Sequence, residues 1–424
     1  MPAEPTAGAA PGHLSLELKP KLETTQAWLY ATASVGTGAF YAFNNFVLPP
    51  ILKAAGAPDL VTGLLASARS IEGVVIQPAV GGLSDRLQTR FGRRKPFMAV
   101  AVPLSAAFFV ASVFTHDLTA LAATIVLFSV FFNIAVDPYT ALLSDIAPLD
   151  QRGPLSGLAT GVQLASSVAL LLVVVVFASG GPGVPAWTYA LVAAAMLLSF
   201  AVTVLGVHEP PLAESVGSQP RRRRAQVRSY AAALLRHPLA LRYLGTLFVY
   251  QFGLNAILPY LVLFIVDDIH QTEQTGFALS AGLLVVTAAA AVGFGKLSER
   301  TGTRAILATG WALLAASAVG GVLVTTLGQT IVVMVLAGVG NGAATAVSWP
   351  LLTALIPPEK TGVFAGLKAA AESVAIPLSV LVAAELFLPW LGYRGIFAML
   401  AITIGVALLL LLRFVHVPPR QPVP

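Results

Sequence analysis

Ionisable residues occur inside the long apolar stretches of this chain, where each needs a physical reason. Arg69 and Glu72 lie three residues apart in one stretch and therefore share a helical face. Asp137 lies in another stretch, and in a third Glu372 follows Lys368 by four residues. An ionisable side chain at the centre of a bilayer costs about 2.5–3.5 kcal/mol on insertion scales. These positions are therefore candidates for moving a proton.

Proton coupling is the chemistry that a buried carboxylate offers, because it can load and release a proton as water access alternates. We expect Asp137 to carry the proton, since its own stretch holds no basic residue. Glu72 and Arg69 would set the electrostatics around it. Structural ion pairing is the alternative, with Arg69 pairing with Glu72 and Lys368 with Glu372.

Amide, phenol and indole side chains recur in the same stretches and could bind a solute that forms hydrogen bonds. Each of them alone is more often a contact between helices than a ligand contact. As a set they predict a central cavity that binds a polar small molecule such as a sugar. The set is Asn44, Asn45, Gln77, Asn133, Gln163, Tyr250, Gln251, Asn255, Asn341 and Trp349.

The composition places these stretches in a membrane. The chain has 424 residues, of which 57% are hydrophobic and 10% charged, and its mean hydropathy is +0.82. A soluble domain carries roughly 25% charged residues, so this chain could not cover a surface that faces water. It has no cysteine, no glycine-rich nucleotide loop, no cluster of metal ligands and no nucleophile triad. We expect a membrane protein that is not an enzyme and holds no cofactor or metal.

About twelve stretches approach the roughly 20 apolar residues that a helix needs to cross a bilayer. A polar segment that contains Arg221 to Arg224 separates the sixth stretch from the seventh. The chain therefore divides into a tail (1–26), a six-helix half (27–207), a linker (208–238), a second half (239–416) and a tail (417–424). The expected spans are 27–50, 60–82, 97–115, 119–146, 155–179, 186–207, 240–266, 276–297, 304–326, 329–356, 363–388 and 393–415.

Basic residues orient these spans, because positively charged loops face the cytoplasm. They gather in alternate loops, whereas the opposite loops offer only Lys53 and Arg394. Both termini are therefore expected in the cytoplasm. The same placement argues against nucleic acid as a partner, despite the net charge of +6. The alternate loops hold Arg86, Arg90, Arg93, Arg94, Lys95, Arg152, Arg221 to Arg224, Lys296, Arg300, Arg304 and Lys360.

A Leu-Ser-acid-Arg motif occurs in both halves, at 83–86 and at 297–300. A glycine such as Gly82 lets two helices approach closely at the membrane edge. We expect these loops to form a latch that holds one side of the molecule shut, with Asp145 as the partner of Arg86. Charge that serves only to orient the chain is the alternative. The latch residues would be Gly82, Asp85, Arg86, Arg90, Arg93, Asp145, Glu299 and Arg300.

This loop resembles the signature loop of the major facilitator superfamily, and that resemblance covers nearly the whole chain. The segments 84–86, 90–97 and 141–145 look like those of the proton-coupled sucrose symporters and, more loosely, of the glycoside–pentoside–hexuronide carriers. The resemblance implies an all-α fold of twelve transmembrane helices in two six-helix bundles, which alternate access to a site between them.

The chain departs from both patterns at particular positions. The sucrose symporters place an arginine just before the Ala-Leu-Leu block, where this chain has Thr140. The sodium-coupled melibiose carriers place acids on the second span, where this chain has Gly73 and Gln77. The resemblance therefore implies neither sucrose itself nor sodium coupling.

We expect a monomeric secondary transporter of a bacterial-type inner membrane that carries a disaccharide or glycoside together with protons. A proton-driven exporter of drugs or amphiphilic lipids is the first alternative, and it predicts a large apolar cavity. A sugar transporter predicts a polar cavity with an aromatic platform. A non-transporting sensor is the second alternative, and it predicts paired acids and no continuous cavity.

Overall fold

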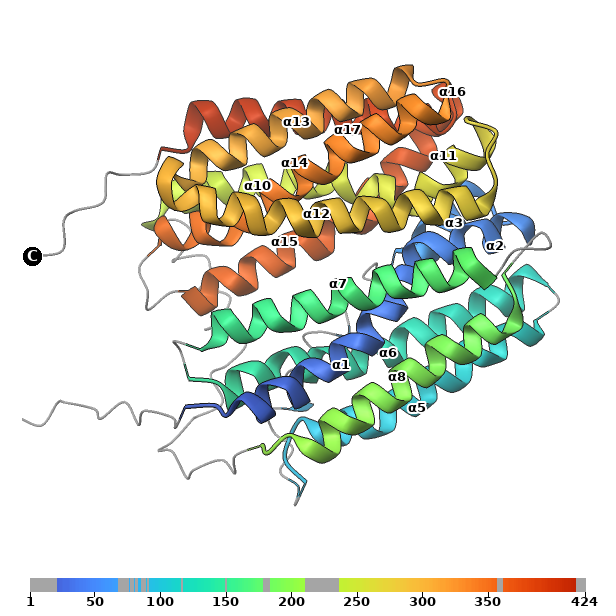
Figure 1. The fold of residues 1–424 in the computed structure, drawn as a ribbon, viewed down its shortest axis with the longest axis vertical. Coiled ribbons are helices and arrows are strands. Elements are labelled where there is room, and N and C mark those ends of the chain that lie inside the picture. The colour runs from blue at the N-terminus through green and yellow to red at the C-terminus, as the bar shows by residue number, and fades with distance from the viewer. Residues whose placement is uncertain are drawn as a thin grey trace, which may run out of the picture.

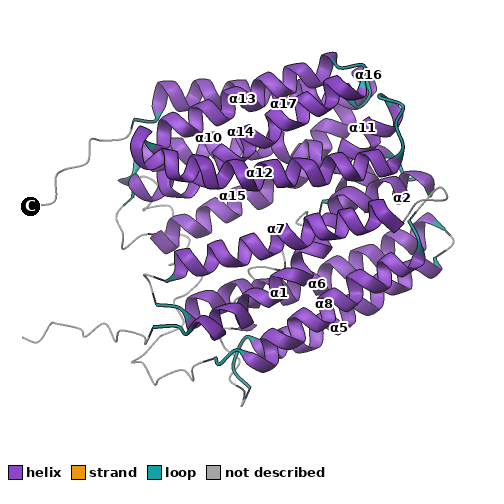
Figure 2. Cartoon of the chain, in the orientation of Figure 1, coloured by secondary structure: helices purple, strands orange, loops and turns teal. Residues whose placement is uncertain are grey.

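The computed structural model is helical throughout the part of the chain that it describes (Figures 1 and 2). No strand occurs within that part. The described residues are 21–67, 91–115, 117–148, 151–177, 184–209, 236–356 and 361–416, with Ile76, Val80, Leu83, Ser84 and Thr89 between the first two ranges.

Each half of the chain forms a bundle, and the helices of the two bundles occupy separate regions in Figure 1. The first half contains α1 (Thr24–Ala42), the π-helical turn η1 (Phe43–Val47), α2 (Leu48–Ala54), α3 (Asp59–Ala66), α5 (Lys95–Ala111), η2 (Ser112–Phe114), α6 (Leu118–Ile146), α7 (Arg152–Phe177) and α8 (Ala186–Gly206). The second half contains α10 (Pro238–Ile257), η3 (Leu258–Tyr260), α11 (Leu261–Asp267), α12 (Glu273–Thr301), α13 (Thr303–Leu323), α14 (Leu327–Ala354), α15 (Thr361–Val382), η5 (Ala383–Phe387), α16 (Leu388–Leu391) and α17 (Arg394–Phe414).

Ten helical segments in the described part are long and apolar enough to cross a membrane. They match the third to twelfth expected spans. The first expected span corresponds to α1, η1 and α2 in succession, and the second begins with α3 and continues into residues outside the described part. The count of twelve therefore stays a prediction.

The two bundles meet along two lines of contact. The helices α7 and α12 pack against each other. At the end opposite to where α1 begins and α17 ends, α3 packs on α15 and α2 on α11. Within the bundles, α1 packs on α7 and α8, whereas α14 packs on α12 and α13. Figure 1 shows α1 beginning and α17 ending on the same side of the molecule.

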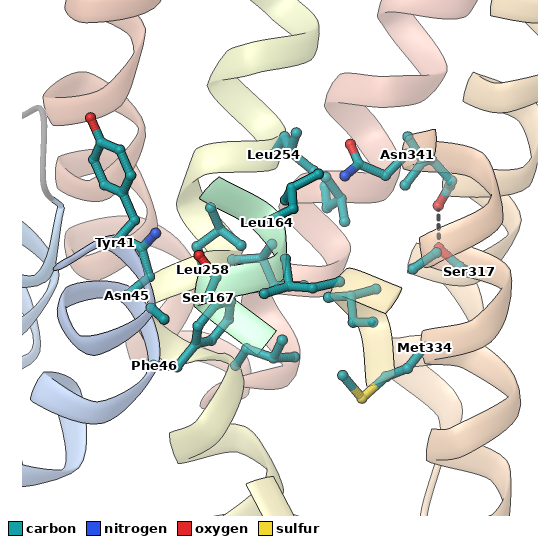
Figure 3. Close-up of a pocket in the computed structure, with 18 of the residues that line it drawn as sticks. Tyr41, Asn45, Phe46, Leu164, Ser167, Leu254, Leu258, Ser317, Met334 and Asn341 are labelled. Atoms are coloured by element: carbon teal, nitrogen blue, oxygen red, sulfur yellow. Dashed lines mark hydrogen bonds between the residues drawn. The ribbon is translucent and has the colours of Figure 1, made fainter. Parts of the chain in front are cut away.

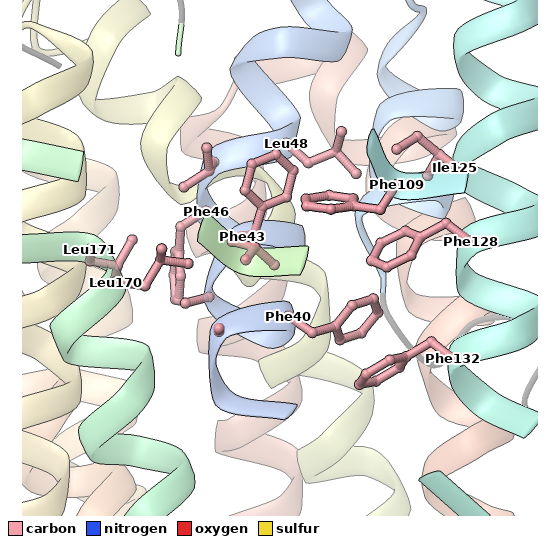
Figure 4. Close-up of a cluster of buried hydrophobic side chains, with 14 of the residues drawn as sticks. Phe40, Phe43, Phe46, Leu48, Phe109, Ile125, Phe128, Phe132, Leu170 and Leu171 are labelled. Atoms are coloured by element: carbon pink, nitrogen blue, oxygen red, sulfur yellow. The ribbon is translucent and has the colours of Figure 1, made fainter. Parts of the chain in front are cut away.

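Aromatic rings fill the core of the first bundle and fix the orientation of the first span (Figure 4). Phe40 stacks on Phe132 of α6, and Phe43 meets Phe109 of α5 edge to face with the ring centroids 4.7 Å apart. These rings hold one face of α1 and η1 against α5 and α6. The face with Tyr41 and Asn45 is thereby left for the other bundle.

Prolines account for the irregular turns η1, η3 and η5, which lie in spans that contact the other bundle. Pro49 and Pro50 lack the N–H groups that would bond to carbonyl groups within η1. Pro259 lies in η3, and Pro389 follows η5. Single π-helical turns within helices are frequent at functional sites, which directs attention to η1.

Gly342 tests the close packing of α12 on α14. A Cβ at Gly342 would lie 2.4 Å from the carbonyl oxygen of Thr287, so Gly342→Ala should force the helices apart. Overpacking of this kind costs about 1–3 kcal/mol, and we expect a lower Tm for the purified protein in detergent. Gly282→Ala is the matched control, since a Cβ there meets nothing within 4 Å. Equal Tm values for the two variants would contradict this view of the packing.

Candidate functional site

A cavity of about 250 Å³ lies between the two bundles (Figure 3). Its walls come from α1, η1 and α7 on one side and from α10 to α14 and α17 on the other. Most of the side chains that line it are apolar, and none of the described residues that line it is charged. The cavity therefore suits a neutral ligand of small size, and it lies where secondary transporters bind their substrates.

Three of the predicted substrate residues line this cavity, namely Asn45 of η1, Gln163 of α7 and Asn341 of α14. Asn341 accepts a hydrogen bond of 3.1 Å from the hydroxyl of Tyr250. The Tyr250 ring stacks on Trp311, with the ring centroids 5.1 Å apart. These contacts hold the Asn341 amide in place, and Figure 3 shows it directed toward the cavity.

A smaller cavity of about 150 Å³ adjoins the first and shares Tyr41, Asn45 and Leu258 with it. It is also lined by Asn255, a fourth predicted residue, whose amide donates to the carbonyl oxygen of Gln251 at 2.8 Å. The two cavities together give the Tyr41 and Asn45 side of the site more polar surroundings than the remainder.

Of the predicted substrate residues that the structure describes, five line neither cavity. Tyr250 donates to Asn341 and Gln251 donates to Glu372, and the other three lie elsewhere. Asn44 donates to the carbonyl oxygen of Ala66 at 2.6 Å and so ties η1 to the end of α3. Asn133 donates to the carbonyl oxygen of Ser129 one turn earlier in α6, at 2.9 Å. The side chain of Trp349 on α14 is partly exposed and lines neither cavity.

Two of the four predicted proton-coupling residues are described. Asp137 is half-buried in α6. Glu372 of α15 accepts hydrogen bonds from Gln251 at 2.7 Å and from Lys368 at 2.5 Å, so it has the partner that the structural alternative assigns to it. The predicted residues Arg69, Glu72, Gln77, Gly82, Asp85, Arg86 and Arg90 lie outside the described residues.

A buried ionic cluster joins segments of the first bundle at the end where α1 begins. Arg93 and Arg94 both form ion pairs with Asp145 of α6, and Arg94 also donates to Ser84. The Glu209 carboxylate, only 3% exposed, accepts from the backbone N–H groups of Arg93 and Arg94. We did not predict Glu209, although an acid directly after the sixth apolar stretch was a usable signal.

The matching loop in the second half differs from this cluster. Glu299 and Arg300 lie in the last turn of α12, and both are exposed. The described part of the expected latch is thus a buried cluster in one half and a solvated pair of residues in the other.

A second set of polar contacts joins the two bundles at the opposite end, and we name it the outer latch because the orientation expected from the basic loops places this end outside the cytoplasm. Asp59 of α3 accepts from Lys53 at 2.7 Å and from the Tyr393 hydroxyl at 3.2 Å, and its backbone carbonyl accepts from the Tyr260 hydroxyl at 2.9 Å. Burial, and then the charge of Asp59, raises the pKa of Tyr393 well above its usual value, so its phenol remains a donor. The bond across the bundles needs Gly63, because a Cβ there would lie 2.1 Å from the Tyr260 hydroxyl oxygen.

Comparison with known proteins identifies a family and two curated relatives. A family model described as MFS/sugar transport protein matches residues 29–416. Proton-associated sugar transporter A of Homo sapiens is 40% identical over 60 residues, which are 14% of this chain and 8% of that protein. Membrane-associated transporter protein of Homo sapiens is 30% identical over 79 residues, 19% of this chain and 15% of that protein. The chain thus matches only a small part of either relative.

Two solved structures resemble the chain over nearly its whole length. A bacterial homologue of the human lysosomal transporter Spinster, in an inward-facing and occupied conformation, has a TM-score of 0.68 at 13% identity and covers 94% of this chain and 98% of its own. The nucleoside transporter NupG has a TM-score of 0.71 at 11% identity, covering 92% and 98%. At such identities the likeness shows the fold alone. It confirms the all-helical transporter fold that the loop motif predicts.

The outer latch can be tested by chemical labelling, since the chain has no cysteine of its own. In an Asn45→Cys background, Tyr260→Phe removes one neutral hydrogen bond between the bundles. Such a bond contributes about 0.5–1.5 kcal/mol, so labelling by an impermeant maleimide from the Asp59 side should rise roughly two- to tenfold. Tyr189→Phe is the control, because its ring packs on Phe43 and Phe109 within the first bundle. Unchanged labelling in Tyr260→Phe would count against a latch.

The buried ionic cluster predicts that removing the charge of Asp145 lowers the thermal stability of the protein more than removing the charge of Glu299 in the matching loop of the second half. Asp145→Asn removes the charge with which two largely buried arginines pair, and a hydrogen bond to a charged group contributes about 1.5–3 kcal/mol. We expect a clearly lower Tm for this variant in detergent. Glu299→Gln removes an exposed acid and should leave Tm unchanged. A similar loss in both variants would show that general charge, and not the cluster, matters.

Proposed function

The chain belongs to the MFS/sugar transport protein family, and from this premise we propose that it is a proton-coupled symporter of a sugar or glycoside. The observation that carries the proposal is the uncharged cavity between the bundles, with Asn45 and Gln163 on one wall and Asn341 on the other. Amides on both walls would let one ligand form hydrogen bonds with both bundles, as alternating access requires.

The outer latch supplies one of the two end states in this mechanism. While Tyr260 and Tyr393 donate to Asp59, the bundles are held together at the end opposite to the start of α1. A substrate that binds both walls would change the relative stability of the closed and open states only by its difference in affinity for them. We place both termini in the cytoplasm and the protein, as a monomer, in a bacterial inner membrane.

Asp137 is the residue that we propose as proton carrier, with Arg69 and Glu72 acting on its charge. Its support is a half-buried carboxylate within a membrane-spanning helix. Glu372 is a second candidate, and its bonds to Gln251 and Lys368 would have to change when it takes a proton. Proton loading there would weaken the ion pair with Lys368.

A second candidate function is export of amphiphilic compounds. The observation in its favour is the mostly apolar lining of the cavity, in which leucine side chains such as Leu254, Leu283 and Leu314 recur. The amides on both walls and the family favour a sugar. The apolar lining nevertheless requires an explanation in any account of the substrate.

If Asp137 carries the coupled proton, its loss should affect proton-driven accumulation of sugar but not sugar exchange. In proteoliposomes, Asp137→Asn should still exchange sugar across the membrane in counterflow, because exchange needs no net proton movement. It should no longer concentrate sugar when a pH gradient is applied. Asp117→Asn is the matched control on the same helix, because asparagine can also cap the helix start where Asp117 accepts from the N–H of Ala120. Accumulation that persists in Asp137→Asn would assign the proton to another residue.

A further inference from the structure

The polar and apolar groups of the cavity are separated along its length. Asn341 and Met334 lie on one face of α14, seven residues or about 10 Å apart along its axis. Figure 3 shows Tyr41 and Asn341 at one end of the cavity and Phe46 and Met334 at the other. The adjoining cavity with Asn255 shares Tyr41 and Asn45 and so extends the polar side.

The end that contains Met334 offers few partners to a hydroxyl group. Phe46 and Met334 are both buried there, and the buried Phe397 also lines the cavity. The two serines that line the cavity, Ser167 and Ser317, donate to the backbone carbonyls of Gly38 and Leu314 at 2.8 Å each. Their hydroxyl protons are thus used within the protein.

The polar and apolar ends of the cavity exclude both a wholly polar and a wholly apolar ligand. A free sugar that filled the cavity would place hydroxyl groups against Phe46 and Met334, where they lose their bonds to water without replacement. A wholly apolar ligand would offer no partner to the amides of Asn45 and Gln163 or to the NH2 group of Asn341, whose oxygen already accepts from Tyr250, and this is also unfavourable. A neutral molecule with one polar and one apolar end satisfies both walls.

We infer that the substrate is a neutral glycoside with an apolar aglycone about the size of one six-membered ring. The sugar would bind at the Asn341 end and extend toward Asn255, and the aglycone would bind between Phe46 and Met334. A cavity of about 150 Å³ is enough to hold benzene, so the main cavity of about 250 Å³ has room for such a ring. This inference rests on the proposed sugar transport, and it accounts for the apolar lining without export.

The experiment compares glycosides that differ only in the aglycone. Counterflow in proteoliposomes would use radiolabelled methyl and phenyl β-glycosides of glucose and of galactose, and ethidium as an amphiphilic cation. For the sugar that is carried, the phenyl glycoside should show a half-saturation concentration about tenfold lower than the methyl glycoside, because the ring is removed from water.

Substitutions at Met334 test where the aglycone binds. Met334→Gln keeps a similar length but adds an amide, so the half-saturation concentrations of the phenyl and methyl glycosides should become nearly equal in this variant. Met334→Leu keeps the apolar end and should preserve the advantage. Val332→Thr is a control on the same helix, since Val332 is 66% exposed on the outer surface of the bundle.

The possible results are distinguishable. Equal half-saturation concentrations for phenyl and methyl glycosides would overturn the assignment of an apolar aglycone and leave sugar transport in place. An advantage that survives in Met334→Gln would overturn the placement of the aglycone. Exchange of ethidium without exchange of any glycoside would overturn the proposed function, and this inference with it.

Discussion

The structure depends on the requirement that backbone polar groups in a bilayer find partners within the chain. Lipid offers no hydrogen bonds, so a spanning segment must be helical unless its irregular part is covered by protein or lines a cavity. The described spans follow this rule. Their irregular turns η1 and η3 contribute Asn45, Phe46 and Leu258 to the cavity walls. These two departures from regular helix thus lie where ligand binding can use them.

The two ends of the molecule are organised differently. The buried ionic cluster connects segments on the side of the first bundle, namely α5, α6 and the residues just after α8. Its members are Arg93, Arg94, Asp145 and Glu209. The outer latch instead connects α3 with η3 and with the turn before α17, and so crosses between the bundles. One set of contacts lies within a bundle, and the other joins the two bundles. Rigid bundles with a breakable contact between them are what rocking motion requires.

Much of this arrangement was predictable from the sequence, because hydropathy and basic residues act locally. The spans from the third onward and the cavity residues Asn45, Gln163 and Asn341 were predicted on that basis. The different fates of Asn44 and Asn45 could not be, since neighbouring side chains point about 100° apart on a helix and only the packing shows which of the two faces α3 and which faces the cavity. Asp59 and Tyr393 lie far apart in the chain, and no local pattern links them.

The outer latch has an electrical consequence. Lys53 and Asp59 lie in the same bundle and form an ion pair, so they would move together as a nearly neutral unit. Tyr260 and Tyr393, which approach from the other bundle, are phenols and carry no charge while protonated. Separating the bundles at this point therefore shifts almost no net charge through the membrane field, in which one elementary charge gains about 2.3 kcal/mol per 100 mV. Opening of the latch should be insensitive to voltage, and any voltage dependence of turnover would originate at the ionisable residues within the spans.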